Sequence, residues 1–154
     1  MSKTLQQGTI DSTFDPALGR GIITFNHPAK ANALDAAMLE QTRNLFEAFD
    51  QNPDVSYITI RGSGGYFSSG VHLDCFSNRT EREKTLTYLN NLLKAIKNAQ
   101  KVVVSEINGP CYGGAMGIVA VTDWAIASPS STFCCPELTH GILPTVIAPY
   151  LAEA

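Results

Sequence analysis

Charged residues are scarce in this sequence. Only 16% of its 154 residues are Asp, Glu, Lys or Arg, whereas soluble domains typically contain about 25%. With so few charged residues, a lone monomer would leave much apolar surface exposed. Large exposed apolar surfaces usually mark interfaces. We therefore expect the chain either to associate with other subunits or to be covered by chain beyond these residues.

Basic clusters and long apolar runs are also missing. The net charge is −3 and no run of Lys and Arg occurs, which excludes the clustered cations that grip a nucleic-acid backbone. No apolar stretch approaches the roughly 18 residues that cross a bilayer, and residues 1–13 lack the apolar core of an export signal. We expect a soluble, cytoplasmic protein that binds neither nucleic acid nor membrane.

Cysteine is too sparse for a disulfide framework. The four cysteines are Cys75, Cys111, Cys134 and Cys135, and an adjacent pair cannot easily bridge to itself. We expect reduced thiols. His72-x-x-Cys75 and the Cys134-Cys135 pair do not supply the spacing of a four-ligand site, so no metal site is predicted.

Strand-like and helix-like patterns alternate along the chain. Runs of β-branched and apolar residues predict strands at 21–25, 55–61, 102–104, 123–127 and 132–135. Apolar residues recur at helical spacing after Asp35, which predicts a helix with Asp35 as its N-cap. A second helix is predicted from a capping box at Thr80-x-x-Glu83 to about residue 99. A short apolar helix is predicted over 115–121. This order indicates a mostly parallel α/β layer, in which ligands collect beyond the carboxyl ends of strands.

Two glycine-rich loops, 62–70 and 108–114, follow predicted strands. Glycine permits close backbone approach, and a helix beginning near Gly114 leaves its first amides unpaired. Together the loops could present two amides to an oxygen that gains negative charge, as an oxyanion hole does. Plain turns and a phosphate cradle are the alternatives, although neither GxxxxGK nor GxGxxG occurs. Since GxSxG is also missing, Ser68 and Ser69 are interpreted as loop residues rather than nucleophiles.

Four segments make the interpretation more specific. They are FNHPAKANAL at 25–34, YFSSGVHL at 66–73, INGPCYGGAMG at 107–117, with Asp123 after it, and FCCPELTHGILP at 133–144. In order and spacing the chain resembles the enoyl-CoA hydratase/isomerase family, or crotonase superfamily. The resemblance implies an α/β crotonase-like spiral of ββα units, with 1–154 as its core domain. That core would be the first three fifths of a chain whose missing C-terminal helices build a homotrimer or hexamer and close the acyl pocket.

The resemblance also implies a substrate and a site. The substrate would be an acyl-CoA or acyl-carrier-protein thioester, with no cofactor beyond the coenzyme A of that substrate. The oxyanion-hole amides fall on Val71 and Gly114. Substrate-binding positions fall on Lys30, Ala31, Ala33, Ser69, Gly70, His72, Gly113 and His140. Lys30 is either the cation for the carrier's anionic groups or a solvated loop charge.

The acid-base residue implied by the resemblance is Glu137. Family hydratases use two glutamates, but the first position is Gly117 here. One carboxyl group can move a proton next to a stabilised enolate, which favours an isomerase or a dehydratase, including the polyketide-branching type, over simple water addition. His72 replaces a usual aspartate and is either a proton donor or a hydrogen-bonded replacement. His140 either tunes Glu137 or is an ordinary histidine. A non-catalytic chain used for assembly or thioester binding is the alternative function.

Overall fold

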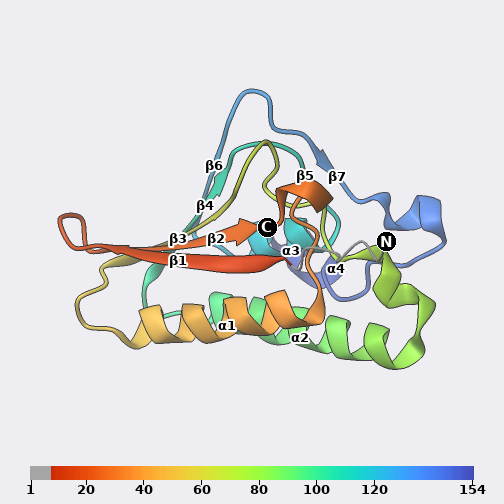
Figure 1. The fold of residues 1–154 in the computed structure, drawn as a ribbon, viewed down its shortest axis with the longest axis horizontal. Coiled ribbons are helices and arrows are strands. Elements are labelled where there is room, and N and C mark those ends of the chain that lie inside the picture. Colours follow the sequence, from red (N-terminus) through yellow and green to blue (C-terminus); the bar gives the residue numbers. More distant parts are fainter. Residues whose placement is uncertain (1–7) are drawn as a thin grey trace, which may run out of the picture.

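The computed structural model describes residues 8–154, which form a twisted sheet with two long helices on one face (Figure 1). The five strands are β1 (Thr9–Asp15), β2 (Arg20–Asn26), β3 (Tyr57–Gly62), β4 (Val102–Ile107) and β6 (Trp124–Ala127). They are ordered β1-β2-β3-β4-β6; β1 runs antiparallel to β2 and the other pairings are parallel. The predicted parallel α/β layer is confirmed.

Helices α1 (Ala36–Gln51) and α2 (Arg79–Lys97) cover the lower face of the sheet in Figure 1. A second, two-stranded sheet pairs β5 (Cys111–Tyr112) with β7 (Phe133–Cys134). The short elements are α3 (Gly114–Ala120), α4 (Ala148–Glu153) and three 3-10 turns, η1 (Pro28–Lys30), η2 (Leu73–Ser77) and η3 (Pro136–His140). These short elements carry the loops that the sequence singled out.

The main core lies between the sheet and the two long helices. Along β2, Ile23 and Phe25 are fully buried while Ile22, Thr24 and Asn26 are half-buried, as expected where side chains alternate between the two faces of a strand. Apolar residues at helical spacing on α1 and α2 form the opposite side of the core. Its fully buried members include Leu39 and Phe46 of α1 and Leu89, Leu92 and Leu93 of α2. The alternating buried residues of the strand and the helically spaced buried residues of α1 and α2 therefore pack together in one apolar layer.

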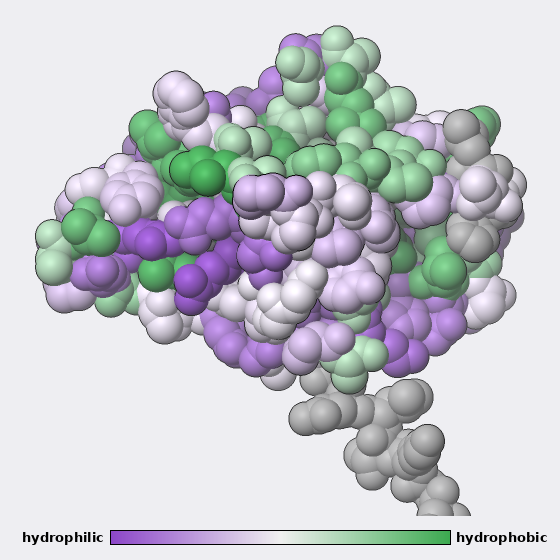
Figure 2. Space-filling view, turned by 90° about the horizontal axis from the view of Figure 1, so that it is seen from above, coloured by the Kyte–Doolittle hydropathy of each residue, from purple (hydrophilic) through white to green (hydrophobic). Residues whose placement is uncertain are grey.

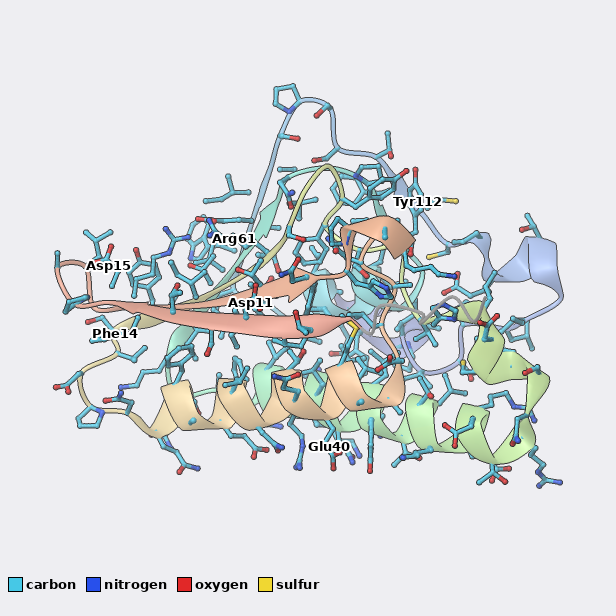
Figure 3. All side chains as sticks on the ribbon, viewed as in Figure 1. Asp11, Phe14, Asp15, Glu40, Arg61 and Tyr112 are labelled. Carbon is cyan, nitrogen blue, oxygen red and sulfur yellow. The ribbon has the colours of Figure 1, made fainter. Side chains whose placement is uncertain are left out.

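Neither α1 nor α2 covers the other face of the sheet (Figure 1). Arg61 projects from this face, whereas Glu40 points away from the sheet on the far side of α1 (Figure 3). Seen from above, apolar and polar areas lie next to each other (Figure 2). Trp124 and Ile126 of β6 are 66% and 62% exposed. Large apolar side chains do reach the surface, as the low charge predicts; subunit association itself stays a prediction.

The predicted strands and helices are present, but two strands were not predicted. Strand β1 has one buried apolar residue, Ile10, among exposed ones, so its hydrophobic pattern is faint. Strand β5 spans only two residues inside a glycine-rich loop. Both depend on partner strands rather than on local sequence, which is why the sequence did not reveal them.

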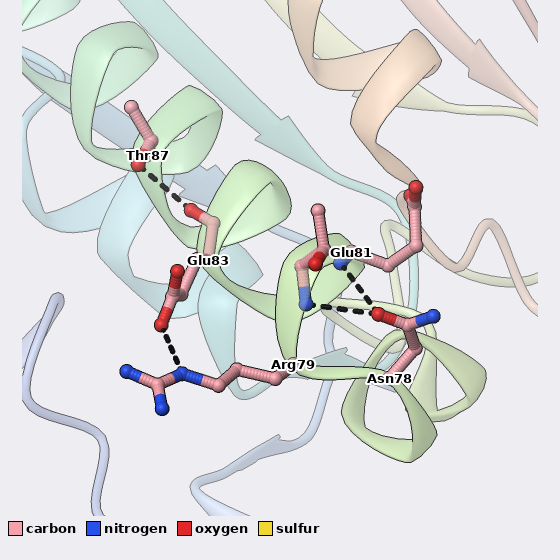
Figure 4. Close-up of polar contacts among 6 residues, drawn as sticks. Asn78, Arg79, Glu81, Glu83 and Thr87 are labelled. Carbon is pink, nitrogen blue, oxygen red and sulfur yellow. Dashed lines mark hydrogen bonds and ion pairs between the residues drawn. The ribbon is translucent and has the colours of Figure 1, made fainter.

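The predicted capping box at Thr80-x-x-Glu83 is wrong. Helix α2 begins at Arg79, and Asn78 is its N-cap: the Asn78 Oδ1 accepts from the amides of Thr80 (2.9 Å) and Glu81 (3.3 Å) (Figure 4). Glu83 instead pairs with the Arg79 Nε, one turn earlier, at 2.8 Å. Asn ranks with Ser and above Thr as an N-cap, so the helix starts two residues earlier than the box predicted.

This assignment predicts opposite results for two neighbouring substitutions. Asn78→Ala should lower the free energy of unfolding by about 1 kcal/mol, because two helix amides lose their acceptor. Thr80→Ala should be neutral or slightly stabilising, since alanine is the better helix former. Urea denaturation of both variants measures the difference, and a larger loss for Thr80→Ala would restore the capping box.

Both glycine-rich loops leave the carboxyl ends of neighbouring parallel strands, β3 and β4. They therefore meet at one edge of the sheet, where α/β proteins bind ligands. None of the helices within residues 8–154 has the length and apolar content needed to span a bilayer.

Candidate active site

A cavity of about 380 Å³ opens between the two glycine-rich loops, α2 and the segment after β7. Its wall includes Val71 and Gly114 from the loops and Glu137 from η3. Most of the remaining wall is apolar and comprises Leu73, Phe76, Leu86, Leu89, Pro136, Ile142, Leu143, Pro144, Val146 and Ile147. The polar side chains of the wall are Lys30, Ser69, His72, Asp74, Glu137 and Thr145; a largely apolar wall with a few polar groups is typical of small-molecule sites.

The peptide unit between Gly70 and Val71 is held by the loop before α1. The Gly70 carbonyl accepts from the Leu34 amide at 2.8 Å, and the His72 amide donates to the Leu34 carbonyl at 2.9 Å. In a trans peptide the carbonyl and the N–H point in opposite directions. The Val71 N–H therefore points away from Leu34, and Val71 lines the cavity.

The second amide belongs to Gly114, the first residue of α3. A Cβ built on Gly114 would lie 3.6 Å from the Val71 amide nitrogen and 3.1 Å from a Val71 methyl, so the two loops touch. Among the described residues, neither the Val71 nor the Gly114 amide has a hydrogen-bond acceptor. Two unpaired donors at one end of a mostly apolar cavity can hold a single oxygen.

Glu137 lies directly against the second loop. A Cβ on Gly113, which has φ 52°, would meet the Glu137 Oε1 at 2.6 Å. The other carboxyl oxygen, Oε2, is buried and has no hydrogen-bond partner among the described residues. An unpaired buried oxygen is costly, and such groups are kept where a ligand or reacting group completes them. The carboxyl group is therefore free to act on a molecule in the cavity.

Gly117 faces a filled space. A Cβ on Gly117 would lie 2.4 Å from the Cγ2 and 3.0 Å from the Cβ of Ile147. Ile147 is 2% exposed and also lines the cavity. No larger side chain fits at position 117 in this packing. The space beside Gly117 is thus taken by an isoleucine that lies 30 residues later in the sequence.

The cavity brings together most of the predicted substrate-binding residues. They are Lys30, Ala33, Ser69, His72 and Gly113. Ala31 and Gly70 are not part of its wall: the Ala31 carbonyl accepts from the Ser69 amide at 2.9 Å, and Gly70, with φ 89°, packs against the Tyr112 backbone. Both support the loop rather than line the site. The side chain of predicted residue His140 lies outside the described part of the chain.

His72 borders the cavity with its ring half-buried. Its Nδ1 accepts from the Asp74 amide at 3.3 Å and lies 3.5 Å from an Asp74 carboxylate oxygen. With Nδ1 as acceptor, the neutral ring carries its proton on Nε2. This is the hydrogen-bonded arrangement, and whether the ring also donates a proton stays a prediction.

All four cysteines are free. Burial raises the pKa of Cys111 to about 12, and burial followed by the nearby Glu137 carboxylate raises the pKa of Cys135. Both thiols therefore stay protonated at neutral pH. Among the side chains that the structure describes, which do not include that of His140, no three of His, Cys, Asp or Glu come together as a metal site would need.

Comparison with known proteins decides the family. The profile named Enoyl-CoA hydratase/isomerase matches residues 19–154. The chain belongs to the enoyl-CoA hydratase/isomerase family. The predicted crotonase-like fold is confirmed by a solved enoyl-CoA hydratase/isomerase (crotonase) from Legionella pneumophila: the TM-score is 0.88 at 28% identity, over 97% of this chain and 59% of that one.

Two curated relatives show the range of activities among similar family members. Enoyl-CoA hydratase AKT6-1 of Alternaria alternata is 32% identical over 131 residues, which are 84% of this chain and 43% of that protein. The mitochondrial 3-hydroxyisobutyryl-CoA hydrolase of Mus musculus is 33% identical over 135 residues, 82% of this chain and 34% of that protein. This chain thus spans less than half the length of these family members.

The sequence did not reveal the apolar wall or its most consequential member, Ile147. Helical spacing had assigned Leu89 to the core and does not tell which core residues border a cavity. The one available signal was Gly117, because a glycine inside a short buried helix implies that something packs closely against it.

Proposed function

We propose that this chain carries the acyl-thioester site of an enzyme of the enoyl-CoA hydratase/isomerase type. In this proposal the Val71 and Gly114 amides hold the thioester carbonyl oxygen, and Glu137 is the only carboxyl group that moves a proton. The observation that carries it is the buried, unpaired Glu137 Oε2 beside two amides that lack acceptors, all on one cavity.

The two amides act on the charge that develops during reaction. When a proton leaves the carbon next to a thioester carbonyl, negative charge moves to the carbonyl oxygen. Losing one such donor in known enzymes costs roughly 3 to 4 kcal/mol of transition-state stabilisation. The largely apolar wall strengthens this interaction, because electrostatic attraction grows as water is excluded. The enolate is therefore the species to which this geometry is best suited.

A single carboxyl group favours proton transfer within the substrate. In an isomerase, Glu137 would remove a proton from C2 of a 3-enoyl thioester and return it to C4, giving the 2-enoyl product. In a dehydratase, it would remove the C2 proton of a 3-hydroxyacyl thioester and deliver it to the hydroxide that leaves C3, releasing water. Ile147 fills the space beside Gly117 where a second glutamate would hold a separate water molecule, so we favour mechanisms in which Glu137 alone carries the proton.

The proposed substrate is an acyl thioester of coenzyme A or of an acyl-carrier protein. Both curated relatives compared above have coenzyme A in their names, and the pantetheine arm is common to the two carriers. Lys30 borders the cavity and is placed here as the cation for anionic groups of the carrier. The acyl group would occupy the apolar end near Leu86 and Leu89.

A panel of thioesters tests the proposal. The intact protein would be incubated in D₂O with 3-enoyl-, 2-enoyl- and 3-hydroxyacyl-CoA and the corresponding pantetheine thioesters, followed by mass spectrometry. We expect deuterium at the carbon next to the carbonyl, with double-bond migration or loss of water. Tight binding of every thioester without exchange would instead support a non-catalytic chain. Turnover at the natural rate in Glu137→Gln would contradict the single-carboxylate mechanism.

A further inference from the structure

Two fully buried polar side chains lie behind the cavity rather than in it. Asn32 and Ser68 are both 0% exposed, and neither belongs to the cavity wall. Buried polar groups stabilise a protein only when they are hydrogen-bonded. Both side chains make several hydrogen bonds, and each has at least one that connects the loop before α1 to the loop that presents Val71.

Ser68 connects the two loops through its hydroxyl. Its Oγ donates to the Asn32 carbonyl at 2.8 Å and accepts from the Gly70 amide at 3.0 Å. Gly70 has φ 89°, a conformation from which a glycine can move easily. The Ser68 hydroxyl thus restrains the amide of Gly70, and the carbonyl of Gly70 forms the peptide unit with the Val71 N–H.

Asn32 connects the same loops from the other side. Its Nδ2 donates to the carbonyls of Ser63 and Tyr66, both at 2.9 Å, and its Oδ1 accepts from the His27 amide at 2.8 Å. Asn32 has φ 54°, and asparagine is among the few residues that adopt this conformation readily. Two residues later, the Leu34 amide holds the Gly70 carbonyl.

We infer that Asn32 and Ser68 are positioning residues, which set the direction of the Val71 N–H through the Gly70–Val71 peptide unit. One bond of that unit, at the Gly70 carbonyl, comes from Leu34 on the Asn32 loop. The other restraint, at the Gly70 amide, comes from Ser68. Rotation of this peptide unit would turn the Val71 N–H away from the cavity without removing any residue that borders it. The inference rests on the proposed function of Val71.

Ser68→Ala provides the first test. We expect its kcat for the thioester reaction to fall by about 10-fold to 100-fold, because a misdirected donor stabilises the transition state poorly. KM should stay within a few-fold, since the apolar wall and Lys30 are unchanged. Ser68→Cys, which nearly keeps the volume but has a weak donor, should lie between Ser68→Ala and the natural protein, and it alone carries the test if Ser68→Ala does not fold.

The control is Ser105→Ala. Ser105 is also 0% exposed and accepts one hydrogen bond, from the Thr122 Oγ1 at 3.2 Å, in strand β4 away from the cavity. We expect this variant to lose stability with kcat unchanged. An equal fall in kcat for Ser105→Ala and Ser68→Ala would reduce the Ser68 effect to general destabilisation and overturn the inference.

A spectroscopic measurement separates the inference from the function on which it rests. Difference infrared spectra of a 2-enoyl-CoA labelled with ¹³C at its carbonyl should show a lower C=O stretching frequency when bound to the natural protein. In Ser68→Ala the bound frequency should move back towards the free value. A full shift retained in Ser68→Ala would overturn the inference alone. No shift in the natural protein would overturn the proposed oxyanion hole and the inference with it.

Discussion

Glu137→Gln is expected to reduce proton exchange at the carbon next to the thioester carbonyl by about 100-fold to 10,000-fold, the usual range for a general acid-base group. Glutamine keeps the shape of the side chain beside Gly113, where the Glu137 Oε1 now lies. It cannot accept the proton. Thioester affinity should therefore stay within a few-fold, because the amides, the apolar wall and Lys30 are untouched.

The comparison needs two measurements on each protein. Single-turnover exchange in D₂O, read by mass spectrometry, gives the chemical step, and calorimetric titration with a non-reactive saturated acyl-CoA gives the affinity. Glu47→Gln is a suitable control, since Glu47 lies on α1 and pairs with Arg43 at 3.3 Å, away from the cavity. Near-normal exchange in Glu137→Gln would remove Glu137 from the mechanism. Loss of affinity together with exchange would make it a binding residue instead.

Gly117→Glu is expected to lower the free energy of unfolding by about 3 to 5 kcal/mol. The added Cβ alone would overlap Ile147, and overpacking of this kind costs about 1 to 3 kcal/mol. The carboxylate would then be enclosed in an apolar region without a cation to pair with, which adds several kcal/mol for a buried charge. Urea denaturation measures the change through the midpoint at constant slope.

Two further variants separate the contributions at this position. Gly117→Ala tests size alone: alanine is better than glycine inside a helix by about 1 kcal/mol, so a net loss of stability shows that the overlap outweighs helix propensity. Ile147→Ala removes the overlapping methyl, and the double variant should cost less than the two single changes added together. If Gly117→Glu were as stable as the natural protein, the inference that Ile147 closes the space at position 117 would fail.

The elements of the site could be predicted because each is marked by a short local pattern, although the patterns lie far apart in the sequence. Val71 and Gly114 follow glycine-rich stretches at the ends of predicted strands, and parallel strands bring their carboxyl ends to one edge. Glu137 was predicted from a motif, and the structure places its carboxyl group against Gly113. Ala31 and Gly70 lie behind the cavity wall, and motif matching alone does not distinguish a residue that lines a cavity from one that supports it.

Local patterns were less reliable where two interpretations competed. Thr80-x-x-Glu83 satisfied the capping-box pattern, yet Asn78 caps α2 and Glu83 pairs with Arg79 instead. The choice between two adjacent caps depends on where the chain enters the helix, and that is set by η2 before it. Strand β1 was missed for a related reason, since it forms through pairing with β2 rather than through its own pattern.

The sequence by itself determined the alternation of strands and helices, the two glycine-rich loops after strands and the lack of a glutamate at position 117, because each depends on residues within one short segment. Only the tertiary structure decided that Ile147 fills the space beside Gly117, that the Glu137 Oε2 has no partner, and that Asn32 and Ser68 tie two loops together. These facts depend on side chains as many as 36 positions apart, and such contacts arise only when the sheet and helices pack.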